Sequence, residues 1–409
     1  MNLQLFPRYM DFSPKVPVYC LTPAHGATIH RFFDTSPISP DQRYLACCVL
    51  PYEDHQPEPN DRVQILLTDL DTGEERVIGE TSGWGIQVGA NLQWGRDSHT
   101  LFYNDVDTKT WQPKLVRHDI QTGDKERMGE GIFMLSPDGN WALTHNLVKS
   151  RITQAGYGVA VPDEYVSTNS DDPQDDGFFL TNVWTGESRL MMPLHKLLHA
   201  GEMDLKEYAG GEFYGFQCKW SPDGKRIMYV VRWLPKDHSM RRAMVFTSDI
   251  ECGDIHLALC WREWAKGGHH VNWHPDSEHI TMNLIFNSRY LKFVSFRYDG
   301  SEFHALSDTI FGSGHPSFQR DGRFLVTDAY VDQDLYTYPD GTTTIRLIDV
   351  QEQTQKEIVR IRTRTGYDQD LRLDPHPAWS RDWRYVTFNG YADGTRRVYI
   401  CDMQEMLKG

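Results

Sequence analysis

The chain has 409 residues, of which 39% are hydrophobic and 24% are charged, and its formal net charge is −15. These proportions indicate a globular protein with a large core, and the acidic balance argues against a broad nucleic-acid interface, because phosphate binding requires a basic surface. A small anionic ligand held in a local basic pocket is compatible with this charge.

Two features bear on the compartment. No apolar run approaches the roughly 20 residues that a membrane-spanning helix requires, and the opening MNLQLFPRYMDFSPKVPVYC lacks the basic-then-apolar pattern of a secretory signal. The 7 cysteines are odd in number and include no CxxC pair, which is typical of a reducing compartment. We therefore expect a cytoplasmic protein that binds neither membrane nor nucleic acid, or a periplasmic or secreted one if a removed signal preceded this sequence.

The first predicted element is a short strand over residues 16–23, VPVYCLTP. After it, a repeat of the form x-x-W-S-P-D-G-K-x-I-x-Y occurs seven times, from ISPDQRYLACCV at 38–49 to WSRDWRYVTFNGY at 379–391. Each copy predicts a strand, a tight polar turn and a second strand with alternating apolar residues. The turn aspartates of the copies are Asp41, Asp97, Asp138, Asp223, Asp276, Asp321 and Asp382.

A second hairpin signature follows most copies, as in TDLDTGEERVI at 68–78 and TNVWTGESRLM at 181–191. Two hairpins per repeat make a four-stranded sheet, so the sequence predicts an all-β, seven-bladed β-propeller that residues 1–409 form as one domain. The last blade lacks one strand, which the 16–23 strand can supply to close the ring. An array of β-sandwiches is the alternative.

The longest gap between turns predicts an insertion. Between Asp138 and Asp223 we find only one second-hairpin signature, so this stretch is predicted to be one blade with a long polar insertion at about 150–179. Long loops on a rigid scaffold often line binding sites.

Three histidines occupy the same place in three repeats, three residues before the aromatic position. This place lies on the innermost strand of a blade, so its occupants are expected to surround the central channel. Imidazoles and an amide oxygen in four consecutive blades are typical ligands of a divalent transition metal, and we expect Zn or Mn rather than Ca. In chain order the occupants are Thr35, Asn91, Ile132, Gln217, His270, His315 and His376.

The predicted metal ligands are therefore Gln217, His270, His315 and His376, with His274 and Asp374 as weaker candidates. The alternative is that these histidines pack against tryptophans and bond backbone carbonyls.

Several of these stretches resemble the propeller-fold polysaccharide lyases, a group that includes the oligogalacturonate lyases and the ulvan lyases. The resemblance is carried by WSPDGKRIMYV, GHHVNWHPD, GSGHPSF and DPHPAWS, and by GYG at 156–158. The first of these is shared with TolB-type and prolyl oligopeptidase propellers. The resemblance implies β-elimination of uronic-acid glycans and a metal in the channel.

The two families imply different site residues. Similarity to oligogalacturonate lyases implies that His270 is the base and that His315 and His376 bind the metal, although Asp374 stands where that family has a second histidine. Similarity to ulvan lyases implies a His/Tyr acid–base pair, an arginine beside the substrate and a structural metal. Because Asp374 departs from the first pattern, the sequence favours the second.

β-Elimination removes the proton alpha to a uronate carboxylate and expels the neighbouring sugar oxygen. The reaction needs a positive charge at the carboxylate, a base for the proton and an acid for the leaving oxygen. We predict His145 and Tyr157 as the acid–base pair and Arg232 as an exposed cation at the channel mouth, with Arg241 and Arg242 nearby. The expected partner is an anionic oligosaccharide or polysaccharide.

Two other classes of function remain open. A non-catalytic, TolB-like interaction scaffold would have no need of titratable groups in its channel. A glycoside hydrolase requires two facing carboxylates, and none stands out at the channel positions. No nucleophile elbow, P-loop or dinucleotide fingerprint occurs, which argues against serine hydrolases and nucleotide-binding enzymes.

Overall fold

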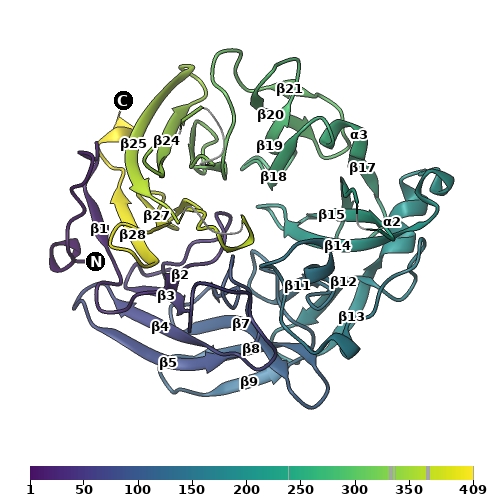
Figure 1. The fold of residues 1–409 in the computed structure, drawn as a ribbon, viewed down its shortest axis with the longest axis horizontal. Coiled ribbons are helices and arrows are strands. Elements are labelled where there is room, and N and C mark those ends of the chain that lie inside the picture. Colours follow the sequence, from purple (N-terminus) through teal and green to yellow (C-terminus); the bar gives the residue numbers. More distant parts are fainter. Residues whose placement is uncertain (238, 331–334, 337, 365–368, 409) are drawn as a thin grey trace.

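The computed structural model describes residues 1–237, 239–330, 335–336, 338–364 and 369–408. Within these residues the strands form seven four-stranded antiparallel sheets, which are arranged as the blades of a ring (Figure 1). The predicted seven-bladed β-propeller is confirmed. The β-sandwich alternative is wrong, because each sheet follows the next around one common centre.

The blades are numbered in chain order. Blade 1 consists of β2 (Thr28–Ile29), β3 (Tyr44–Val49), β4 (Val63–Asp69) and β5 (Glu75–Thr81), and blade 2 of β6 (Gln93–Trp94), β7 (Thr100–Asp107), β8 (Gln112–Asp119) and β9 (Lys125–Met128). Blade 3 consists of β10 (Met134–Leu135), β11 (Trp141–His145), β12 (Gly177–Asn182) and β13 (Ser188–Pro193), and blade 4 of β14 (Gly211–Trp220), β15 (Arg226–Pro235), β16 (Arg242–Asp249) and β17 (His256–Leu259). Blade 5 consists of β18 (Gly268–Trp273), β19 (His279–Ile285), β20 (Leu291–Arg297) and β21 (His304–Ala305), and blade 6 of β22 (Ser317–Phe318), β23 (Phe324–Thr327), β24 (Thr342–Asp349) and β25 (Thr354–Arg362). Blade 7 consists of β26 (Ala378–Trp379), β27 (Tyr385–Gly390), β28 (Arg397–Asp402) and β1 (Val18–Cys20).

Short helices lie between or beside the blades. They are η1 (Leu3–Leu5), α1 (Ser150–Thr153), η2 (Asp163–Tyr165), α2 (Leu194–Ala200), η3 (Leu205–Tyr208), α3 (Trp261–Trp264), η4 (Gln369–Leu371) and η5 (Met406–Lys408). None of the helices in the described part of the chain is long and apolar enough to cross a membrane.

The N-terminal strand closes the ring as predicted. β1 is the outer strand of blade 7 and pairs with β28, with Val18 opposite Cys401 and Cys20 opposite Tyr399. Both chain termini consequently lie on the same side of the ring, beside blade 7 (Figure 1). Pairing of the first strand with the last hairpin joins the two ends of the chain into one blade.

The repeated turn has a chemical reason. In blade 4 the Ser221 hydroxyl lies 2.7 Å from a carboxylate oxygen of Asp223, and Ser221 Oγ accepts a hydrogen bond from the Arg226 amide at 2.9 Å. The side chains thereby satisfy the backbone of the turn. The aromatic position links blades, since the Trp273 indole of blade 5 donates to the Lys219 carbonyl of blade 4. The same serine–aspartate contact occurs at Ser39–Asp41, Ser136–Asp138 and Ser380–Asp382.

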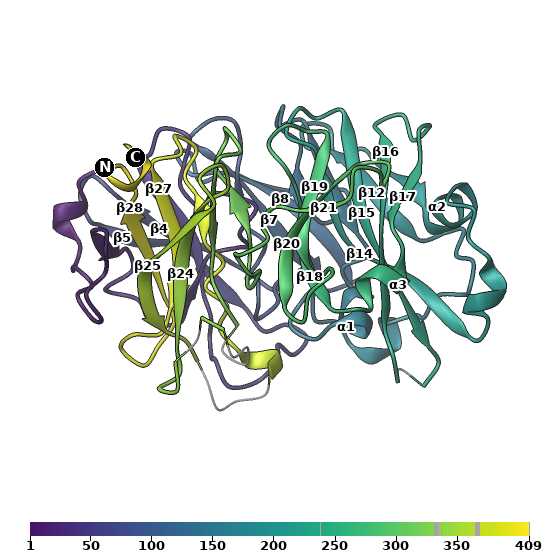
Figure 2. The same cartoon turned by 90° about the horizontal axis from the view of Figure 1, so that it is seen from above.

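The insertion lies inside blade 3, between β11 and β12, so the long gap in the repeat pattern does contain one blade only. It contains α1 and η2, and α1 lies against β14 of blade 4. Seen from the side, α1 and α3 lie at the same face of the ring (Figure 2). That face is where the candidate site is found.

Candidate active site and metal centre

A segment of blade 1, residues 31–35, fills the central channel. Arg31 and Lys219 both pair with the buried Asp34, the second at 2.8 Å, and Arg31 also bonds the Asn91 side chain of blade 2. Phe32 follows Arg31 in the chain, and the centroid of its ring lies 4.8 Å from the centroid of the His376 imidazole. The segment thus contacts blades on opposite sides of the channel and closes the floor of the cavity described below.

Irregular backbone points the repeat histidines inward. The pairing of β18 with β19 shifts register between His269 and Asn272, and His270 within this bulge has a φ of 59°. His376, just before β26, has a φ of 50°. A left-handed φ is uncommon for residues other than glycine, and bulges commonly redirect side chains next to functional sites. The regular strand pattern alone would not place these side chains together.

Three of the four predicted metal ligands do lie close together. The imidazole centroids of His270 and His315 are 3.7 Å apart, and those of His315 and His376 are 4.3 Å apart. One nitrogen each of His315 and His376 and one carboxylate oxygen of Asp374 lie within 4.8 Å of one another, and all three residues are buried. Asp374, which the sequence offered only as a weaker candidate, therefore belongs to this buried cluster.

Several imidazole nitrogens of the cluster are buried without a hydrogen-bond partner among the described residues. His315 Nδ1 lies 2.9 Å from Asp328 Oδ2, and its buried Nε2 has no hydrogen-bond partner among the described residues. Neither ring nitrogen of buried His376 has such a partner either. Unpaired buried polar atoms are costly, and a carboxylate that orients a histidine from behind is the usual outer shell of a metal ligand. The residues therefore fit a divalent ion held by two imidazoles and a carboxylate.

Gln217 lies at a register shift in β14 and lines the neighbouring cavity together with His270. His274 is in the hairpin turn of blade 5, where its Nδ1 lies 3.0 Å from Asp276 Oδ2. The placement of His274 gives no support to its role as an extra channel ligand.

His270 is held by its own contacts. Its Nδ1 lies 2.7 Å from the Gly314 carbonyl oxygen, which can only accept, so Nδ1 carries the hydrogen. Its Nε2 is then the basic nitrogen, and it lies 3.0 Å from the Tyr330 hydroxyl. Burial and the neighbouring His315 lower the pKa of His270 well below its ordinary value, so the ring is neutral at neutral pH.

A cavity of about 350 Å³ opens beside His270 on the face that carries α1 and α3. Phe32 and Phe216 contribute apolar surface, and the polar groups come from five parts of the chain. They are Gln154, Tyr157, Gln217, Arg232, Arg241, His269, His270, Tyr330 and Arg372. Three arginines, two tyrosines and two histidines around one small cavity suit an anionic ligand and proton transfer.

Two of the three predicted catalytic residues line this cavity. Tyr157 lies in the insertion, and burial raises the pKa of its phenol to about 12, so the group is protonated at neutral pH. Arg232 is only 6% exposed, and its guanidinium stacks 3.2 Å from the centre of the Phe216 ring. The expectation that Arg232 is an exposed surface cation is therefore wrong, because the insertion covers it and the Thr153 carbonyl accepts its hydrogen bond.

His145 does not line the cavity. It is 3% exposed, and its Nε2 lies 2.7 Å from the hydroxyl of buried Ser150 at the start of α1. Burial and the charge of Arg232 lower its pKa to about 3. The contact holds the insertion against blade 3, which is one layer behind the cavity wall.

Several residues of the site were not predicted. Arg372 lies outside the repeat phrase, whereas Asp328 and Tyr330 lie inside its copy at 318–330 but were not singled out. A signal for Asp328 exists, because residues seven places after the turn aspartate bind the channel-facing backbone of the next blade. The side chain of Asn104 binds Ile132 in this way, that of Asn283 binds Gly314, that of Asp328 binds His376 and that of Asn389 binds His30. His145 occupies the same position in blade 3.

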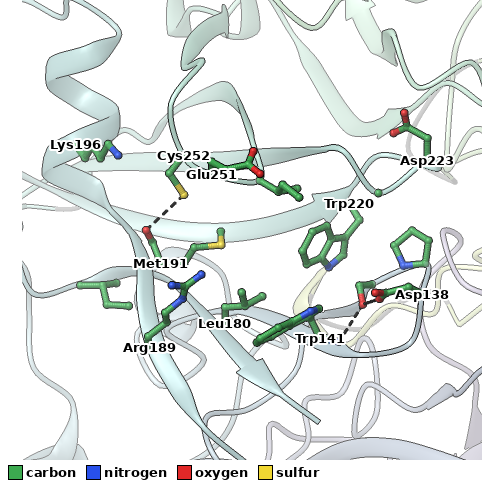
Figure 3. Close-up of a pocket in the computed structure, with 15 residues that line it drawn as sticks. Asp138, Trp141, Leu180, Arg189, Met191, Lys196, Trp220, Asp223, Glu251 and Cys252 are labelled. Atoms are coloured by element: carbon green, nitrogen blue, oxygen red, sulfur yellow. Dashed lines mark hydrogen bonds between the residues drawn. The ribbon is translucent and has the colours of Figure 1, made fainter. Parts of the chain in front are cut away.

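A larger cavity, of about 710 Å³, lies between blades 3 and 4 (Figure 3). Trp141, Trp220, Arg189 and Lys196 line it, with Asp138 and Asp223 from the two hairpin turns. Its lining includes neither histidine nor tyrosine, and no metal cluster is found there among the described residues. The smaller cavity is therefore the better candidate for a reaction that moves protons.

No protein-family model matches the sequence, and no curated protein matches it significantly. Solved structures do match the fold. An oligogalacturonate lyase in complex with manganese gives a TM-score of 0.67 over 99% of this chain and 97% of its own, at 16% sequence identity. The oligogalacturonate lyase of Vibrio parahaemolyticus gives 0.67 over 98% and 97%, at 14% identity.

A protein named for a different activity also matches. The β-propeller domain of the trilobed protease from Pyrococcus furiosus gives a TM-score of 0.52 at 11% identity, covering 92% of this chain and 96% of that domain. At these identities the comparisons show a shared propeller fold.

Proposed function

We propose that the protein is a lyase that cleaves a uronate-containing oligosaccharide by β-elimination in the 350 Å³ cavity. The observation that carries the proposal is a set of cations without anions. Arg232 and Arg241 line the cavity, and among the described residues neither makes a salt bridge with a carboxylate. Arg241 is exposed, but Arg232 is buried, and a buried guanidinium without a counter-ion is unfavourable, so this wall favours an anionic ligand.

The charge of the arginines serves the chemistry as well as binding. The proton alpha to a carboxylate is barely acidic while the carboxylate is fully charged. A guanidinium that bonds the carboxylate stabilises the extra charge that develops when the proton leaves. A bidentate contact from Arg232 or Arg241 would also orient the sugar.

We infer that His270 is the base, with Tyr330 as its hydrogen-bond partner. His270 is neutral, its Nε2 has the lone pair, and that atom faces the cavity residue Tyr330 at 3.0 Å. Tyr157, which is protonated and lines the same cavity, is suited to protonate the leaving sugar oxygen. This assignment follows the oligogalacturonate-lyase pattern for the base, since His145 lies behind the wall.

The buried cluster of His315, His376 and Asp374 would hold the metal. A divalent ion there supplies positive charge beneath the cavity, and nitrogen and carboxylate donors suit manganese or zinc. Asp374 also accepts a hydrogen bond from Arg372 at 2.9 Å, so the proposed ligand set is connected to a cavity arginine. The similar solved lyase that contains manganese supports this choice of ion.

The test is a panel of oligouronates incubated with the purified, metal-loaded protein. β-Elimination leaves a conjugated unsaturated uronate, which absorbs in the ultraviolet, whereas hydrolysis leaves a new reducing end without that absorbance. We expect the unsaturated product from at least one acidic oligosaccharide and none from its fully methyl-esterified form, because esterification removes the charge that the arginines bind. Reducing ends without absorbance, or cleavage of the neutral ester alone, would overturn the proposal.

A further inference from the structure

Outside the channel, two histidines and an aspartate meet at the outer edge of the ring. His195 and His199 lie on α2, which is at the periphery beside blades 3 and 4 (Figure 1). Asp172 lies in the insertion that precedes β12. Its Oδ1 is 2.9 Å from His195 Nδ1, and its Oδ2 is 3.0 Å from His199 Nε2.

The helix brings the two imidazoles to one side. Residues four apart in a helix lie on the same face, one turn above the other. The ring centroids of His195 and His199 are 4.2 Å apart, and both rings turn toward the same carboxylate. This differs from an ordinary surface ion pair, in which one histidine meets one carboxylate.

We propose that Asp172, His195 and His199 form a zinc site, separate from the channel cluster, that fastens the insertion to α2. One ligand atom from each residue lies within 4.8 Å of the others. In tetrahedral zinc sites with bonds of about 2.0–2.1 Å, ligand atoms are about 3.3 Å apart. The observed 2.9–3.0 Å separations need to open only slightly.

The donor set decides the kind of ion. Calcium and magnesium require shells of oxygen atoms, whereas two imidazoles and one carboxylate are a zinc set with one open position for water. Partial exposure of the three residues leaves an entry path from solvent. Neither the ligands nor the geometry depends on the proposed reaction in the channel.

A metal here would act on the segment that covers the cavity. Backbone hydrogen bonds already join the insertion to α2, since the His195 amide donates to the Pro173 carbonyl at 2.9 Å. The same insertion carries Tyr157 and the Thr153 carbonyl that binds Arg232. Zinc would therefore hold one end of the segment whose other end forms the cavity wall.

The chain contains a matched control. Asp276 also contacts two histidines, His274 at 3.0 Å and His279 at 2.8 Å, but their ring centroids are 6.4 Å apart. This group has the same residue types as the group of Asp172, His195 and His199, but its two imidazoles lie farther apart. His279→Gln should therefore leave zinc binding unchanged.

The experiment is a zinc titration of metal-free, full-length protein, with bound zinc counted by elemental analysis. We expect the double variant His195→Gln/His199→Gln to bind one zinc fewer per chain than both the wild type and His279→Gln. Added zinc should protect residues 150–176 from limited proteolysis in the wild type and not in the double variant, whose channel histidines are intact. Equal zinc content and equal protection in the double variant and the wild type would show a plain ion pair and overturn the site.

Discussion

The arginines on the two walls of the candidate cavity differ in whether they have a carboxylate partner. On the blade-4 side, Arg232 and Arg241 bond only the Thr153 carbonyl and the Gln154 side chain among the described residues. On the opposite side, Arg372 is paired with Asp374 at 2.9 Å, and His270 is bonded to Tyr330. The first wall lacks an anion, whereas the arginine of the second wall has a carboxylate partner within the protein.

The pKa directions agree with this difference. Burial, together with the adjacent Arg241, lowers the pKa of Arg232 well below its ordinary value. For Arg372, burial also acts to lower the pKa, but the Asp374 carboxylate and the phenols of Tyr330 and Tyr157 together outweigh it, and the net shift is upward. In the proposed reaction, the blade-4 wall would therefore receive the negative charge of the ligand, and the other wall would supply the base and the metal ligands.

The largest expected effect is on the wall that transfers protons. Because His270 has the basic nitrogen that faces the cavity, His270→Ala should lower the lyase rate by about 10²- to 10⁴-fold, the usual cost of removing a general base. Its metal content should be unchanged, because His315, His376 and Asp374 remain. Initial rates and elemental analysis of the same preparation measure both quantities.

His145→Ala is the matched control, since His145 is the other histidine proposed for acid–base work. Its rate should stay close to that of the wild type, because the side chain contacts Ser150 and not the cavity. The reverse result, with activity lost in His145→Ala and kept in His270→Ala, would restore the ulvan-lyase pattern that the sequence favoured.

The next largest effect concerns the wall that lacks an anion. Arg232→Met keeps the side-chain volume and removes the charge, so we expect a loss of about 10²- to 10³-fold in rate, comparable to removing one charge-stabilising donor. The melting temperature should be unchanged or higher, because the variant no longer buries an unpaired cation. Enzyme assays and thermal unfolding of the same variant check both expectations.

Arg242→Met provides the comparison for this variant. Arg242 is the next residue after Arg241, but it packs 4.5 Å from the Trp233 ring and does not line the cavity. It should lose stability through weaker packing and keep its activity. Similar rates for the two methionine variants would mean that the unpaired charge of Arg232 has no part in the reaction.

The architecture could be predicted from the sequence because the contacts that define each blade are local. Each turn aspartate and each inter-blade tryptophan makes contacts within a few residues or with the neighbouring repeat, so periodicity alone identifies the blades. The strand closing blade 7 was predictable for the same reason, since an incomplete last hairpin requires a partner.

The site was predicted less completely, because its residues come from separate blades and loops that meet only in the folded ring. The shared position of His270, His315 and His376 brought these side chains together correctly. Asp374, in the loop before β26, is the third residue of the close group, and the sequence offered it only as a weaker candidate. Tyr330 ends one copy of the repeat but was not singled out, and Arg372 belongs to a segment that no repeat describes.

The metal cluster offers a third, smaller effect. Asp374→Asn removes the charged ligand, so we expect metal affinity to fall by at least about 10- to 100-fold, the range found for changes around metal sites. The protein should also melt at a lower temperature, because the bound ion stabilises only the folded state. Elemental analysis and thermal unfolding, with and without added manganese, measure the change.

Gln217→Ala tests the same cluster from the other side. Because Gln217 lines the cavity beside His270, and the variant leaves the cluster of His315, His376 and Asp374 intact, its loss should leave metal content unchanged. If Gln217→Ala loses the ion and Asp374→Asn retains it, the ligand set predicted from the sequence is the correct one.

The smallest expected effect separates the layer behind the cavity from the cavity itself. Burial and the charge of Arg232 lower the pKa of His145 to about 3, against an ordinary value of 6.5. Between these values the unfolded chain binds a proton at this residue and the folded chain does not, so stability is complete above about pH 6.5 and falls as the pH drops. The loss between pH 7 and pH 5 should be about 2 kcal/mol. In His145→Gln, denaturant unfolding should show a pH dependence that is weaker by about this amount, and an unaltered pH dependence would mean that His145 is solvated and free to reach the cavity.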